Sequence, residues 1–215
     1  MGFFHSLDEK EFAELLSMSS LHSYEDGYVL YYENTPHHDL FFLVEGLARA
    51  YKMDKYDNET FLYYIYPDSL ISEITDLGSE TIESFSNVEI VEDAQIVHID
   101  FRRFKKQFLQ TNRLCPQMSE EILKRTRQMQ SLINREFVFD AVEKVAMMLC
   151  SDLSMFNKLK RHDIALMLHI QPATLSRVLN KFKRDNLITI DHGHVSVTDF
   201  AALGLLYKEK TGEKD

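Results

Sequence analysis

A basic segment near the C-terminus, residues 158–185, has the residue types that contact nucleic acids. It holds seven Lys or Arg residues and two acidic ones. If residues 171–185 form a helix, the apolar residues share one face by their i, i+3, i+4, i+7 spacing. That apolar face consists of Leu175, Val178, Leu179 and Phe182. The opposite face presents Ala173, Thr174, Ser176, Arg177, Asn180 and Lys181. Since arginine binds guanine edges through two hydrogen bonds, this face predicts a helix that reads the DNA major groove.

The elements around this segment fit the same chemistry. A helix is expected over Arg161–Leu168 and a second over Gln171–Asp185, with Pro172 at the start of the second, where proline is favoured. A hairpin around residues 191–194 and a closing helix over Thr198–Lys208 follow. Helix, turn, helix and hairpin is the order of a winged helix-turn-helix. Lys160, Arg161 and His162 then lie where the first helix crosses the phosphate backbone, and Gln171 lies at the start of the recognition helix. The simpler alternative is an amphipathic helix whose polar face is only solvated and binds no nucleic acid.

The charge is divided unequally along the chain. The 215 residues carry 34 acidic and 24 basic side chains, a net charge of −10. Residues 1–110 hold 21 acidic and 8 basic residues (−13), whereas residues 111–215 hold 13 acidic and 16 basic residues (+3). This asymmetry predicts two domains with different partners. No apolar run is long enough to cross a membrane, and the two cysteines, Cys115 and Cys150, fit a reducing cytoplasm.

The N-terminal half has the pattern of a small β-roll. A helix over Phe3–Met18, capped by Ser6, is followed by short runs rich in Tyr, Phe, Ile and Val, and then by a helix over Phe101–Leu109. The expected strands are Tyr28–Tyr32, Leu40–Val44, Ala48–Met53, Thr60–Tyr66, Val88–Val91 and Ile96–Ile99, with a turn at Glu45-Gly46. Short strands at near-regular spacing are typical of a barrel or roll.

A long helix is expected over residues 112–134, with heptad spacing along one side. The residues of this seam are Met118, Ile122, Arg125, Met129 and Leu132. The seam predicts either a dimer coiled coil or packing on the chain's own roll, and the spacing alone does not separate the two. A further apolar helix is expected over Phe137–Leu153, with a short connection to the DNA-binding motif.

The order of roll, long helix and winged helix resembles the CRP/FNR superfamily of bacterial transcription regulators. The most specific likeness is Thr174-Leu175-Ser176-Arg177, which is similar to the recognition-helix core of that family. The resemblance implies an α+β fold: a β-roll sensory domain (residues 1–110) of the double-stranded β-helix, cyclic-nucleotide-binding type, a dimerisation helix (111–135) and a winged helix-turn-helix (136–215). It also implies that Ser176 and Arg177 contact bases, and that Thr174 and Lys160-Arg161 contact phosphates.

The same resemblance implies partners. They are a second copy of the chain, a palindromic site on double-stranded DNA with half-sites about one turn apart, and RNA polymerase. Two departures from the family pattern bear on this. Ala173 replaces a frequent Glu, so the base pair facing it differs, because alanine fits a thymine methyl and cannot accept from cytosine. His169 replaces a frequent turn glycine, and histidine tolerates the positive φ of such a turn better than most residues.

The family's usual effectors fit this sequence poorly. Cyclic AMP needs a cationic phosphate site, but residues 56–101 contain no Lys or Arg, and the matching segments read Ser72-Glu73-Ile74 and Glu83–Ser86. An iron–sulfur cluster generally needs four cysteines, and this chain has two. Haem, as in relatives that sense nitric oxide or carbon monoxide, stays open, with His37 and His38 as candidate ligands. A solvated polar turn is the simpler interpretation of that pair.

Two alternatives remain from the sequence. The roll of a DNA-binding regulator can be free of any ligand and serve only for dimerisation or polymerase contact. A cupin-type metalloenzyme also uses a small β-roll, but adjacent residues such as His37 and His38 point to opposite faces of a strand, and Glu45 lies seven residues further on. We therefore expect no enzyme and no metal site.

Overall fold

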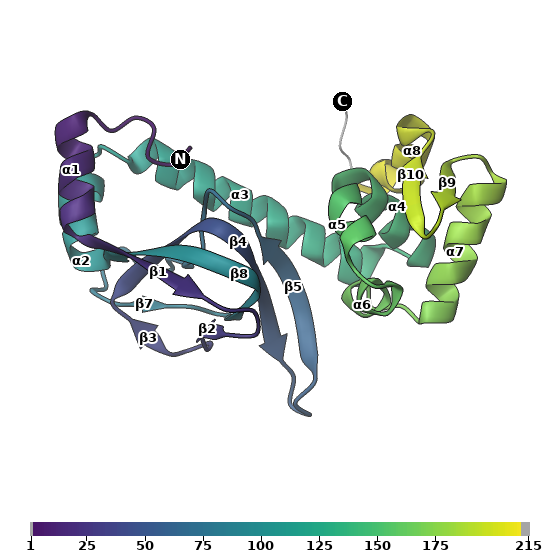
Figure 1. Cartoon of the computed structure of the whole chain (residues 1–215), viewed down its shortest axis with the longest axis horizontal. Coiled ribbons are helices and arrows are strands. Elements are labelled where there is room, and N and C mark those ends of the chain that lie inside the picture. The colour runs from purple at the N-terminus through teal and green to yellow at the C-terminus, as the bar shows by residue number, and fades with distance from the viewer. Residues whose placement is uncertain (1, 212–215) are drawn as a thin grey trace. The chain divides into compact units, whose positions relative to one another are not determined.

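The computed structural model describes the backbone of residues 2–211 and the side chains of residues 2–208. The chain divides into two compact units, Met1–Gln128 and Met129–Asp215, and each is described by itself. The helices are α1 (Glu9–Ser17), α2 (Phe101–Phe104), α3 (Cys115–Ile133), α4 (Ala141–Ser151), α5 (Leu153–Lys158), α6 (Arg161–Met167), α7 (Pro172–Arg184) and α8 (Phe200–Thr211). Two π-helical turns, η1 (Lys105–Leu109) and η2 (Asn134–Val138), extend α2 and α3. Figure 1 shows these elements along the chain.

The strands form a roll in the N-terminal unit and a hairpin in the C-terminal one. They are β1 (Ser19–Tyr24), β2 (Val29–Tyr31), β3 (Pro36–His37), β4 (Asp39–Met53), β5 (Glu59–Ile65), β6 (Ser69–Leu70), β7 (Ile82–Glu83), β8 (Asn87–Asp100), β9 (Ile188–Asp191) and β10 (His194–Val197). The main sheet has the order β1-β8-β4-β5, with β2 paired to β8 and β6 to β4. Strands β3 and β7 pair with each other, as do β9 and β10. Of the strands not expected from the sequence, β1 is polar and β3, β6 and β7 have two residues each.

The long antiparallel pair β4–β8 is the frame of the roll. The expected strands Leu40–Val44 and Ala48–Met53 are one strand, β4, and the two expected in the region of β8 are also one. The predicted turn at Glu45-Gly46 is wrong, because Gly46 has a φ of 91° and the register shifts around it while β4 continues. Bulges of this kind bend and twist a strand without ending it.

The N-terminal helix starts later than expected. Asp8, not Ser6, caps α1, and its carboxylate accepts from the backbone N–H of Glu11 while the Glu11 side chain accepts from that of Asp8. Phe3 and Phe4 lie before the helix with their rings in the core, where Phe4 packs 5.0 Å from Phe42 between ring centroids. The prediction failed because burial of two adjacent aromatic rings outweighs the local helix signal.

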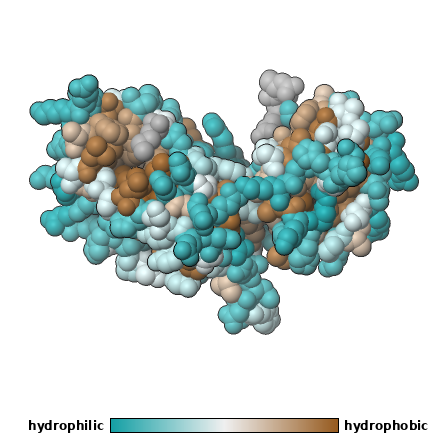
Figure 2. All heavy atoms as spheres, in the orientation of Figure 1, coloured by the Kyte–Doolittle hydropathy of each residue, from teal (hydrophilic) through white to brown (hydrophobic). Residues whose placement is uncertain are grey.

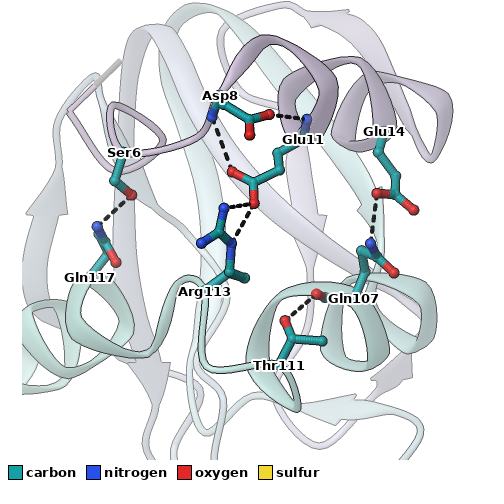
Figure 3. Close-up of polar contacts among 8 residues, drawn as sticks. All are labelled: Ser6, Asp8, Glu11, Glu14, Gln107, Thr111, Arg113 and Gln117. Carbon is teal, nitrogen blue, oxygen red and sulfur yellow. Dashed lines mark hydrogen bonds and ion pairs between the residues drawn. The ribbon is translucent and has the colours of Figure 1, made fainter.

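Polar contacts also fasten the N-terminal segment to the helices that follow the roll (Figure 3). The Gln117 side chain donates to the Ser6 hydroxyl at 2.7 Å, and the Gln107 side chain donates to Glu14 at 2.6 Å. Arg113 pairs with Glu11. Residues 2–18 are therefore part of the roll unit.

The C-terminal unit is helical apart from the hairpin. The expected helix over Phe137–Leu153 is interrupted, since Phe139 is extended and Asp140 caps α4 through a capping box with Glu143. The connection from this helix to the motif contains no strand, in line with the short connection expected, but it includes an additional helix, α5, which begins at Leu153. None of the helices within residues 2–211 combines the length and apolar character needed to cross a bilayer.

Replacing Gly46 by alanine should destabilise the roll. A Cβ at this position would lie 2.4 Å from the Asp93 carbonyl oxygen and 2.7 Å from Ala94 Cα, in addition to the strain of a positive φ. We expect a loss of about 2–4 kcal/mol in the free energy of unfolding, measured with urea. The control is Gly27→Ala, which has a φ of 84° and nothing within 4 Å, and should cost about 1 kcal/mol. Equal losses would show that the close approach at Gly46 is unimportant.

Candidate nucleic-acid interface

Helix α7 forms where the sequence predicts a recognition helix. It begins at Pro172, with Gln171 preceding it in extended conformation and contributing no side-chain cap. The predicted inner face is confirmed, since all four of its apolar side chains are buried: Leu175, Val178, Leu179 and Phe182. Because a helix turns about 100° per residue, burying this face directs the polar face outward.

The outer face of α7 carries the predicted contact residues. Thr174 is half-buried, and the others are exposed: Ala173, Ser176, Arg177, Asn180 and Lys181. The Arg177 guanidinium donates to the Thr174 hydroxyl at 3.0 Å, and the Ser176 hydroxyl donates to the Pro172 carbonyl at 3.1 Å. Both bonds are exposed and local, so a ligand can replace them at little cost.

A groove of about 700 Å³ lies between α7 and the start of α4. Its lining includes four basic side chains and no acidic one: Arg177, Lys181, Lys183 and Arg184. Ala141 and Val142 form the other wall. Lys183 and Arg184 were missing from the contacts predicted by sequence reasoning, although both stand in the basic segment. Their spacing from Arg177 along the helix could have suggested a shared surface. Only the packing of α7 against α4 shows that Lys183 and Arg184 line the same groove as Arg177.

The hairpin of β9 and β10, here called the wing, is held in place by side chains from other elements. Asn157 clamps β10, because its side chain donates to the Val195 carbonyl and accepts from the Val195 N–H, each at 2.8 Å. The predicted hairpin turn is confirmed at His192-Gly193, both with positive φ. Arg161 donates to the Gly193 carbonyl at 2.7 Å and lies over the ring of Phe156 at 4.7 Å. Lys160 and His162, beside it, are exposed.

A buried carboxylate lies in the roll, in the region that matches the cyclic-nucleotide segment. Glu73 is 5% exposed. Its carboxylate accepts from the Tyr63 hydroxyl at 2.5 Å, the Ser86 hydroxyl at 2.9 Å and the Phe85 N–H at 3.0 Å. Burial raises the pKa of Tyr63 above its ordinary value, so this phenol stays protonated and donates. The carboxylate is thus satisfied by the chain itself.

The candidate haem ligands differ in exposure. His37 packs against the rings of both Tyr31 and Phe41, at centroid distances of 5.0 and 5.1 Å, and burial lowers its pKa. His38 is exposed. Glu45, the third residue considered for a cupin-type site, is also exposed. In the part of the chain that the structure describes, no three His, Cys, Asp or Glu side chains are grouped to hold a metal ion.

The residues of the heptad seam lie in different surroundings. Met118 is buried in the core of the roll unit. Arg125 donates to the carbonyl of Leu70 at 2.5 Å and lies 4.9 Å from the ring centroid of Tyr63. Ile122 is 54% exposed, whereas Met129 and Leu132 are half-buried. Further exposed apolar side chains on α3 and η2 are Leu123, Ile133, Phe137 and Val138.

The cysteines are both half-buried thiols outside any disulfide. The Cys115 thiol donates to the Leu109 carbonyl at 3.3 Å, and burial raises the pKa of the Cys150 thiol. A raised pKa keeps a thiol protonated and unreactive at neutral pH. Cys150 therefore has the character of a packing residue.

Comparison with known proteins agrees with this geometry. Residues 143–206 match the Crp-like helix-turn-helix domain. No curated protein matches the chain in sequence. Among solved structures, a CooA variant from Carboxydothermus hydrogenoformans is similar, with 20% identity, a TM-score of 0.73, and coverage of 93% of this chain and 92% of that chain.

Two further solved structures are similar over most of this chain. FixK2 from Bradyrhizobium japonicum has 18% identity and a TM-score of 0.68, covering 88% of this chain and 97% of that chain. A regulator of the crp/fnr family from Eubacterium rectale has 17% identity and a TM-score of 0.68, covering 97% and 98%. The chain therefore has a Crp-like helix-turn-helix domain and the α+β fold of the CRP/FNR superfamily of transcription regulators, which confirms the predicted resemblance.

Proposed function

We propose that the chain is a sequence-specific DNA-binding transcription regulator that acts as a homodimer. The observation that carries this proposal is the exposed, basic outer face of α7 within a Crp-like helix-turn-helix domain. Such a helix enters the major groove with its N-terminal residues toward the bases. A bacterial regulator meets its DNA in the cytoplasm, so the proposal places the chain there.

The residues of α7 divide by the contacts they would make. Arg177 reaches a guanine edge through two hydrogen bonds, and Ser176 contacts a neighbouring base. Ala173, being small and apolar, faces a thymine methyl. Asn180 and Lys181 continue the same face toward the rim of the DNA groove. These contacts supply sequence discrimination, because each base pair has its own pattern of donors and acceptors in the major groove.

Phosphate contacts come from the basic groove and from the start of α6. Lys183 and Arg184 share the groove with Arg177, and Thr174 lines it as well. Lys160 and His162 are exposed at the first turn of α6 and provide a second contact to the backbone. Phosphate contacts fix the register of the protein on DNA and make binding dependent on salt.

Dimerisation through α3 is supported by apolar side chains that the chain leaves exposed. Phe137 is 84% exposed, and Ile122, Leu123 and Ile133 are each more than half exposed. Figure 2 shows, on the face drawn, apolar residues (brown) at the surface of each unit among polar ones (teal). Since Met118 and Arg125 contact the chain's own roll, the proposed seam uses these exposed residues together with Met129 and Leu132. A two-fold dimer reads a palindromic site, and RNA polymerase is its expected further partner at a promoter.

The roll is proposed not to take cyclic AMP. Besides the anionic character of residues 56–101, the carboxylate of Glu73 is already occupied by Tyr63, Ser86 and the Phe85 N–H. This observation favours a roll closed by its own side chains over one gated by an effector. An effector other than cyclic AMP, haem with His37 or His38 included, is the second candidate. The regulator proposal does not depend on which of the two holds.

Arg177 and Lys183 should affect DNA binding differently. Arg177→Ala should lose about 1–3 kcal/mol of binding per half-site on a duplex selected from a random pool, and little on a scrambled duplex. Lys183→Gln should weaken both duplexes alike and reduce the slope of log K against log salt by about 1 per phosphate lost. Fluorescence anisotropy at several salt concentrations measures both. Lys10→Gln, an exposed lysine on α1, is the charge control. Unchanged operator binding by Arg177→Ala would exclude this recognition face.

Alanine variants of Arg161 and Lys160 should distinguish a residue that supports the wing from one that contacts phosphate. Because Arg161 holds the wing through Gly193, Arg161→Ala should lower the unfolding free energy by about 1–2 kcal/mol. Lys160→Ala should leave stability unchanged and reduce the salt slope by about 1. Thermal unfolding and anisotropy provide the two measurements. If both variants changed only the salt slope, the bond from Arg161 to the wing would contribute nothing.

Phe137 should be needed for the dimer. Phe137→Asp should raise the dimer dissociation constant by about 100-fold or more, since each dimer loses two aromatic anchors worth at least about 1.4 kcal/mol apiece. Sedimentation velocity measures the shift. The matched control is Leu205→Asp on α8, which is 64% exposed and should leave association unchanged. A dimer unaffected by Phe137→Asp would move the interface elsewhere.

A further inference from the structure

The turn between α6 and α7 is stabilised by an unusual residue. His169 follows Leu168, the C-cap residue of α6, and has a φ of 50°. Its N–H donates to the Leu166 carbonyl, and the Ile170 N–H donates to the Ala165 carbonyl, both at 3.0 Å. This geometry is that of a left-handed helix cap, for which glycine is the favoured residue. The positive φ therefore costs His169 some backbone strain, which the contact made by its side chain can offset.

The His169 side chain contacts a residue far away in the sequence. Its Nδ1 lies 2.6 Å from Glu136 Oε2, across 33 positions of the chain. Glu136 belongs to η2, the π-helical turn that follows α3, and both residues lie in the C-terminal unit. The second carboxylate oxygen of Glu136 accepts from Arg135 at 2.9 Å. Burial raises the pKa of Glu136, but the bonds from Arg135 and His169 outweigh this and leave the pKa below its ordinary value, so the carboxylate is charged.

A second charged group holds the same turn from α4. The buried ammonium of Lys144 donates to the Leu168 carbonyl at 3.1 Å, one residue before His169. The turn is thus bound on one side to α4 and on the other to η2. Only Ile170 and Gln171 separate His169 from the first residue of α7. The position of this turn therefore sets where α7 begins and which way its N-terminal residues point.

We propose that His169 is a positioning residue, whose bond to Glu136 fixes the direction in which α7 presents its base-contacting residues. The proposal rests on the proposed function and deepens it. The contact links the turn before the recognition helix directly to the end of the long helix, so a rearrangement of η2 is passed to α7 through one pair of side chains. Hydrogen bonds to base edges discriminate between sequences and depend on the direction of α7, whereas phosphate contacts carry no sequence information, so a misdirected α7 should lose more affinity for the operator than for a scrambled duplex.

A double-mutant cycle tests the proposal. His169→Gly keeps a residue that adopts positive φ readily and removes only the imidazole. Each of His169→Gly and Glu136→Ala should reduce the ratio of affinities for a selected operator and a scrambled duplex by about fivefold per half-site, the factor that corresponds to about 1 kcal/mol for a partly exposed pair. The double variant should lose no more than either single one, because the two changes remove the same contact. An unchanged ratio, or losses that simply add, would overturn the proposal.

A second measurement requires no DNA. Amide hydrogen exchange at Ile170, whose N–H closes the turn, should be faster by about the same factor in both single variants. The control is His192→Gly in the wing turn, a 97% exposed histidine with a φ of 45°, which should leave Ile170 exchange unchanged. If the wild-type chain selected no operator, the proposed function would fail. Ile170 amide exchange would still decide whether Glu136 and His169 hold the turn. If exchange in the two single variants equalled that of the wild type, this positioning role would be overturned as well.

Discussion

Burial of one face of α7 is the constraint on which the C-terminal unit depends. Phe182 and Leu175 are at most 1% exposed, and a helix that buries one stripe has to turn the opposite stripe to solvent. The basic outer face is the consequence. The other contacts of the unit serve to hold this helix: α6 packs against it, the wing follows it, and the turn between α6 and α7 is bound by Lys144 and Glu136.

The distribution of charge explains how one acidic chain can approach DNA. The acidic excess lies in residues 1–110, while the groove beside α7 is lined by basic residues without an acidic one. Local charge, not the net value, determines the attraction to phosphates, because screening limits surface electrostatics to about 8–10 Å at physiological salt. The same division leaves the roll poor in cations, and its buried Glu73 is satisfied by neutral donors.

The fold could be predicted from the sequence wherever the signals are local. Helices α6 and α7 and the hairpin lie within about two residues of their expected bounds, because Pro172 and the His192-Gly193 turn mark them within a few positions. The beginning of α1, the break before α4 and the continuity of β4 were missed. For α1 and β4 a distant contact decided the result: Phe3 and Phe4 pack on Phe42, and β8 pairs with β4 across the bulge at Gly46. The break before α4 is local, since Asp140 caps that helix through a capping box with Glu143.

What the sequence by itself determined is the identity of the chemistry: a helix with one apolar and one basic face, a roll without basic residues between positions 56 and 101, and two separate units. These properties follow from composition and from periods of a few residues. Tertiary structure alone decided which groups meet. It placed Lys183 and Arg184 in the groove of Arg177, bound Arg161 to the wing, and joined His169 to Glu136. Such contacts bring together residues tens of positions apart, or place neighbours against a distant wall, and depend on how whole elements pack, which no local pattern of residues encodes.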